Sequence, residues 1–160
     1  MDSRIEQAVA TFESGYTCAQ SVFATYADLF GMDRQTALKL ASPMGGGVGR
    51  MREICGVVSA MALLAGLKEG NTDPENEEGK ERIYLLVREM ADKFKAKNNS
   101  IICRELLGIE GREESARPSA RTKEYYASRP CSRLVADAAR IIEEMLLGDE
   151  DVGGSEKGVS

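Results

Sequence analysis

Four cysteines are the residues in this chain whose chemistry is most specific. The sequence contains no histidine, which removes the commonest metal ligand and the usual general base at neutral pH. Nucleophilic catalysis by a Ser–His–Asp or Cys–His arrangement within the chain is therefore excluded. No two cysteines form a Cys-x-x-Cys pair, so neither a thioredoxin-like motif nor a zinc ribbon is indicated. The four are Cys18, Cys55, Cys103 and Cys131.

Each cysteine is expected close to the start of a helix. The apolar periodicity places Cys18, Cys103 and Cys131 in a first helical turn, and Cys55 in a first or second turn. Arginines lie one to three residues from three of these cysteines, namely Arg52, Arg104, Arg129 and Arg133. If the helix starts converge, the thiols would share one electropositive pocket.

A glycine-rich segment comes before Cys55. Backbone N–H groups in such a loop can point outward together, so an anion or a cofactor could bind there. The same glycines could instead form a tight connection that requires positive φ angles. The segment is not a P-loop, because no Gly-Lys-Ser/Thr follows it and no strand precedes it. The candidate ligand-binding residues are Gly45, Gly46, Gly47, Gly49 and Arg50.

Cys55 is predicted to be the most reactive thiol. The N–H donors of the loop and the nearby Arg50 and Arg52 would favour its thiolate, and would hold its pKa below the free value of about 8.5. Burial among the apolar residues of its helix would raise the pKa instead. We expect the dipole and the arginines to outweigh burial.

The elements that must position these residues all have helical periodicity. We find no convincing alternating run, so the prediction is an all-α bundle of about six or seven helices in a single domain. Residues 109–130 lack periodicity and are interpreted as a connection. We expect a helical domain at 1–148 and a disordered acidic tail at 149–160. The predicted helices cover residues 3–14, 17–31, 33–43, 55 to 66 or 70, 81–97, 101–107 and 130–147.

Composition limits the partners and the compartment. The net charge of −5 over 160 residues argues against a nucleic-acid partner. No apolar run reaches about 18 residues and the first residues do not resemble a signal peptide, so we expect no membrane insertion and a cytoplasmic location. Cysteines in that compartment are more often thiols, metal ligands or redox groups than permanent disulfides. The sequence leaves a homodimer open.

Several of these segments resemble one protein family. They are residues 15–22 around Cys18, residues 45–50, the Cys55-Gly56 pair, Cys103 before Leu107-Gly108, and residues 129–131. The chain is similar, over roughly residues 5 to 146, to the C_GCAxxG_C_C family of "putative redox-active proteins", and all four cysteines match in order. Where the family has Cys-Gly-Ala-x-x-Gly, this chain has Val57 and Ala60 at the third and sixth positions. The resemblance implies a small, mostly helical protein with a redox or metal-linked role, and it implies no substrate.

Three hypotheses follow. In the first, the protein is a thiol redox protein in which Cys55 attacks and Cys18 resolves the mixed intermediate, with a redox partner or a small molecule that the sequence does not identify. In the second, Cys18, Cys55, Cys103 and Cys131 are ligands of a metal ion or an iron–sulfur cluster. In the third, the protein is a helical interaction module whose cysteines are inert core residues.

Overall fold

The fold is all-α, as predicted. The computed structural model describes residues 2–111 and 113–148, and within these ranges it contains eight α-helices and no strand. The predicted tail at 149–160 lies outside the described residues. The helices are α1 (Ile5–Glu13), α2 (Cys18–Tyr26), α3 (Arg34–Ala41), α4 (Gly56–Glu69), α5 (Glu77–Asn98), α6 (Cys103–Leu107), α7 (Lys123–Ser128) and α8 (Cys131–Ile142).

Two helix boundaries differ from the prediction. α7 lies in the segment that was interpreted as a connection, and the side chain of Thr122 caps it by accepting a hydrogen bond from the N–H of Tyr125. α5 begins four residues before the predicted start, because Asn76 caps it by accepting from the N–H of Gly79. Both starts depend on a single polar cap rather than on an apolar period. Three short turns, η1 (Ala27–Phe30), η2 (Ser42–Met44) and η3 (Glu143–Leu147), extend α2, α3 and α8.

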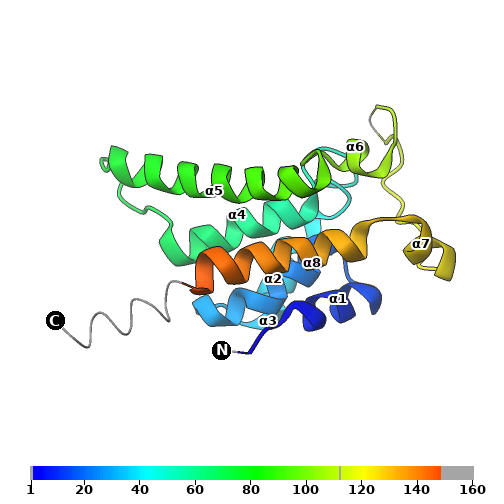
Figure 1. The fold of residues 1–160 in the computed structure, drawn as a ribbon, viewed down its shortest axis with the longest axis horizontal. Coiled ribbons are helices and arrows are strands. Elements are labelled where there is room, and N and C mark those ends of the chain that lie inside the picture. The colour runs from blue at the N-terminus through cyan, green and yellow to red at the C-terminus, as the bar shows by residue number, and fades with distance from the viewer. Residues whose placement is uncertain (1, 112, 149–160) are drawn as a thin grey trace.

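The core is built around α2 and α4. α4 is apolar on nearly every side, and it packs against α2, α5 and α8. α1 and α3 cover the other faces of α2, and α8 also packs against α1. The starts of α2, α4 and α8 lie at the end of the bundle where α6 and α7 are found (Figure 1). This arrangement brings helix starts that are far apart in the sequence to one end of the molecule.

An antiparallel backbone pairing joins the start of α4 to the start of α6. Ile54 and Ile102 form an isolated β-bridge. The N–H of Cys55 donates to the carbonyl of Ile101 at 2.8 Å, and the N–H of Cys103 donates to the carbonyl of Glu53 at 2.6 Å. Cys55 and Cys103 therefore flank the same bridge, which fixes their backbones side by side.

The loop before this bridge has an unusual backbone. Residues 46–50 all have positive φ angles, from 57° at Gly49 to 73° at Gly47, and Arg52 has a φ of 61°. This conformation costs about 1–2 kcal/mol for a residue with a Cβ, and it is most unusual for the β-branched Val48. The N–H groups of residues 48–53 all donate to carbonyls of residues 43–48. These N–H groups therefore do not point outward together, as an anion cradle would require.

Gly47 is predicted to tolerate alanine much less well than Gly49. Both have positive φ, but a Cβ at Gly47 would lie 2.6 Å from Cβ of Cys103, whereas the nearest atom to a Cβ at Gly49 would be 3.9 Å away. Gly49→Ala should lower the free energy of unfolding by about 1 kcal/mol from backbone strain, and Gly47→Ala by at least about 2 kcal/mol more from overpacking. Urea unfolding of the reduced variants measures both values. Equal losses would contradict the close approach of the loop to α6.

Candidate functional site

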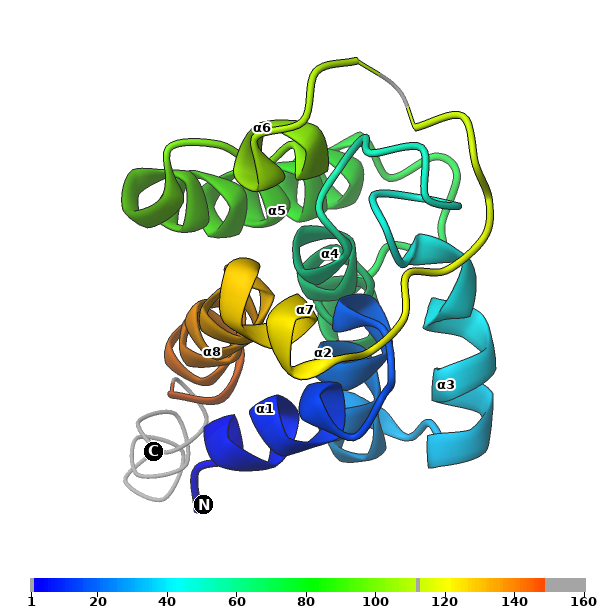
Figure 2. The same cartoon turned by 90° about the vertical axis from the view of Figure 1, so that its right-hand side faces the viewer.

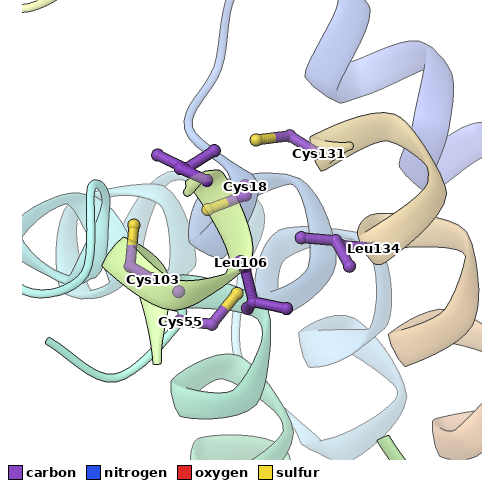
Figure 3. Close-up of a pocket in the computed structure, with 8 residues that line it drawn as sticks. Cys18, Cys55, Cys103, Leu106, Cys131 and Leu134 are labelled. Carbon is purple, nitrogen blue, oxygen red and sulfur yellow. The ribbon is translucent and has the colours of Figure 1, made fainter. Parts of the chain in front are cut away.

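All four cysteines line one cavity at the end of the bundle. Cys18, Cys103 and Cys131 are the first residues of α2, α6 and α8, and Cys55 is the N-cap of α4. The predicted convergence of these helix starts is therefore confirmed (Figure 3). The cavity has a volume of about 20 Å³, which is enough for one water-sized group. The other lining residues are Gly56, Leu106, Leu107 and Leu134.

Cys18 is held against the first turn of α4. The side chains of Thr17 and Gln20 form a capping box that fixes the start of α2. A Cβ at Gly56 would lie 2.7 Å from Sγ of Cys18, so glycine at this position allows the sulfur to approach. Burial raises the pKa of Cys18 to about 12, and the neighbouring Cys131 and Cys103 act in the same direction. The Cys18 thiol therefore stays protonated at neutral pH.

The predicted low pKa of Cys55 is wrong. Cys55 is only 4% exposed, and burial raises its pKa well above the ordinary value, with a further contribution from Cys18. The two arginines that were expected to favour its thiolate make their hydrogen bonds elsewhere, Arg52 with Cys103 and Arg50 with Ser115 and Ser119. Burial, which was expected to be the weaker effect, therefore determines the charge state of Cys55.

A buried guanidinium lies beside Cys103. Arg52 is only 3% exposed, and its Nη1 donates to Sγ of Cys103 at 3.7 Å. Its Nε has no hydrogen-bond partner, and no carboxylate among the described residues pairs with it. A buried cation is costly unless a neighbouring group compensates it, and the sulfur of Cys103 is the group that Nη1 contacts. Cys103 is thus the cysteine that a guanidinium contacts directly.

Two further arginines act on Cys131. Burial raises the pKa of this half-buried thiol, and the guanidinium groups of Arg129, Arg121 and Arg52 act in the opposite direction. The guanidinium carbons of Arg129 and Arg121 lie 4.4 and 4.7 Å from the ring centroid of Tyr125. Sequence analysis missed Arg121 and its contact with Tyr125, because their segment has no periodicity that would assign it to this site.

The other two arginines of the predicted pocket do not contribute such contacts. Arg104 forms an ion pair with Glu53 at 2.9 Å, which reinforces the pairing between the starts of α4 and α6. Arg133 is exposed on α8. The positive charge at the cavity thus comes from Arg52, Arg121 and Arg129.

The glycine-rich loop supports the site through packing. A Cβ at Gly45 would meet Thr17 at 2.7 Å, and one at Gly47 would meet Cys103, so the loop fits closely between α2 and α6. Arg50 donates to the carbonyl of Ser115 at 2.7 Å and to Oγ of Ser119 at 2.9 Å, which holds residues 113–122 around the outside of the loop (Figure 2). Ligand binding by Gly45, Gly46, Gly47, Gly49 and Arg50 stays a prediction.

The metal hypothesis finds no support in this arrangement. Within residues 2–111 and 113–148, no three Cys, Asp or Glu side chains form a group that could hold a metal ion. The four cysteines share a cavity without forming a ligand set. None of the described helices is long and apolar enough to cross a membrane.

Fold and site together define an all-α protein with four thiols around one small cavity. A comparison with protein families matches residues 16–145 to the family described as "Putative redox-active protein (C_GCAxxG_C_C)". The match covers most of the chain, and the protein belongs to this family. A search of curated proteins and a search of solved structures found no match.

The raised pKa of Cys18 predicts a loss of stability at alkaline pH. Because the pKa rises from 9.0 to about 12 on folding, this thiol's contribution to stability is fully present below about pH 9 and is lost as the pH rises toward 12. In that interval this group lowers the free energy of unfolding by up to about 1.4 kcal/mol per pH unit. Urea unfolding of reduced wild type and Cys18→Ser at about pH 8 and about pH 10 tests this prediction. The variant should lose less stability than the wild type, and equal losses would contradict the assigned burial.

Proposed function

We propose that the protein is a thiol–disulfide exchange protein in which Cys103 is the attacking thiolate and Cys131 is the resolving thiol. The observation that carries this proposal is the contact between the buried Arg52 guanidinium and Sγ of Cys103. A thiolate, rather than a thiol, is the nucleophile in such exchange. The family description is consistent with a redox role of this kind.

The reaction is a two-electron exchange with a disulfide R–S–S–R. The Cys103 thiolate bonds to one sulfur of the substrate, the S–S bond breaks, and R–S⁻ leaves. The thiol of Cys131 then gives its proton to the released R–S⁻ and attacks Sγ of Cys103, and the second R–S⁻ leaves and takes a proton from water. The protein is oxidised from one thiolate and one thiol to one disulfide, and the substrate is reduced to two thiols.

Cys131 is assigned as the resolving residue because Cys103 is the cysteine whose charge acts on its thiol. Cys18 is half-buried like Cys131, but burial raises the pKa of Cys18 to about 12, whereas three arginines oppose the effect of burial on Cys131. The pKa values of Cys18 and Cys55 are both raised, and Cys18 contributes to the shift of Cys55. The close approach of Cys18 to Gly56 places it beside the start of α4, where Cys55 lies. We assign these two as a second, protonated pair that does not make the first attack.

Removal of Cys103 should abolish the fastest reaction of the protein with iodoacetamide at neutral pH. Arg52→Gln should slow that reaction by roughly 10- to 100-fold, since a hydrogen bond to a charged group contributes about 1.5–3 kcal/mol. Arg52→Lys keeps the charge and should retain much of the rate. Arg133→Gln, which removes an exposed arginine of α8, is the matched control and should change the rate little.

The order of attack can be tested with a trapping variant. Cys131→Ser treated with bis(2-hydroxyethyl) disulfide should accumulate a mixed disulfide on Cys103, because the resolving thiol is missing. The wild type should release both halves of the reagent as thiols. If Cys103→Ser retains the fastest-reacting thiol, or if the adduct in Cys131→Ser lies on another cysteine, then the assignment of the attacking residue is wrong.

A further inference from the structure

We infer that Arg121 and Arg129 form a carboxylate-recognition site beside Cys131 of the cysteine cavity, so that the protein selects small disulfides that carry carboxylate groups. This inference rests on the proposed exchange function and names its substrate class. It depends on observations different from those that assign Cys103.

Neither arginine has an anionic partner among the described residues. Within that part of the chain, Nη1 of Arg121 is buried and has no hydrogen-bond partner, and Arg129 donates to Oγ of Ser119 over a long distance of 3.4 Å. In the described part of the chain no carboxylate pairs with either of them, although the sequence has 26 acidic residues and a net charge of −5. A buried charged donor without a partner is rare in folded proteins, and a bound anion would supply the missing acceptor.

Other arginines of the same protein are neutralised by ion pairs. Arg4 pairs with Asp28 at 2.7 Å, Arg50 with Glu113 at 3.6 Å and Arg104 with Glu53 at 2.9 Å. Arg121 and Arg129 thus form a local excess of positive charge in an acidic molecule. Their charges reach the reacting groups, since both act on Cys131.

Aromatic rings hold the two guanidinium groups in place. Both lie over the ring of Tyr125, and the guanidinium carbon of Arg121 is also 5.1 Å from the ring centroid of Phe12. Phe12 belongs to α1 and is almost fully buried, so the platform is anchored to the body of the bundle. Arginines fixed in this way lose little conformational entropy when they bind a carboxylate.

The size of the cavity limits how much of the substrate can enter. About 20 Å³ is enough for one water-sized group, so most of a disulfide substrate stays outside the cavity. We place that part of the substrate beside Cys131, on which Arg121 and Arg129 act. A carboxylate a few bonds from the sulfur could then contact a guanidinium while the S–S bond meets Cys103. The same positive charge would stabilise the departing R–S⁻ thiolate.

The first test compares iodoacetate with iodoacetamide, which differ by one negative charge. The ratio of the iodoacetate rate constant to the iodoacetamide rate constant should fall about tenfold from the wild type to Arg121→Gln/Arg129→Gln, because the two cations that attract the carboxylate of iodoacetate are removed. Arg133→Gln removes an exposed arginine two residues after Cys131 and should leave the ratio unchanged. Addition of 0.5 M NaCl to the wild type should lower the rate with iodoacetate and leave the rate with iodoacetamide unchanged. Arg121→Lys/Arg129→Lys retains both charges and should keep much of the ratio, even if the glutamine variant folds poorly.

The second test separates this inference from the exchange function. We expect the wild type to react faster with 3,3′-dithiodipropionate than with the neutral bis(2-hydroxyethyl) disulfide, and the preference should disappear in the double glutamine variant. Carboxylate recognition would be overturned if both disulfides reacted at equal rates and if neither the arginine substitutions nor salt changed the alkylation ratio. The exchange function would still stand in that case. If neither disulfide reacts but the alkylation ratio depends on the arginines, anion recognition stands and the exchange function fails.

Discussion

The short antiparallel pairing between residues 52–55 and residues 101–104 is the constraint on which the site depends. It fixes Cys55 and Cys103 on either side of the Ile54–Ile102 bridge. The same pairing places Arg52 next to the start of α6, where its Nη1 donates to Sγ of Cys103. The strained loop of residues 46–50 serves this geometry, because its positive φ angles turn the chain back into the bridge. Loss of the pairing would separate Cys103 from the guanidinium of Arg52.

Cys55 and Cys103 show how neighbours determine the chemistry of equally buried thiols. They are 4% and 8% exposed, so both sulfurs are shielded from water. Cys55 lies among apolar side chains and beside the protonated thiol of Cys18. Its pKa is raised well above the ordinary value. Cys103 instead contacts a buried guanidinium. The charge next to the sulfur, rather than the position at a helix start, distinguishes the two cysteines.

Helical periodicity predicted the fold class, most helix positions and the placement of all four cysteines at helix starts, because burial of an apolar stripe leaves a local pattern. The contacts of the arginines left no such pattern. Arg52 is three residues from Cys55 in sequence, yet it contacts Cys103 through a tertiary bridge. Arg121 reaches the site from a segment without periodicity. Long-range backbone pairing and side-chain direction decided these contacts, and neither is encoded in local spacing.

The account predicts that Cys103 and Cys131 form a disulfide when the protein is oxidised without unfolding. The most direct measurement is peptide mapping by mass spectrometry after brief treatment of the reduced wild type with a small disulfide and an acid quench. The predicted first product is an intramolecular disulfide between Cys103 and Cys131, with Cys18 and Cys55 still reduced. A first disulfide that joins Cys18 to Cys55, or cysteines that link only between molecules, would contradict the account.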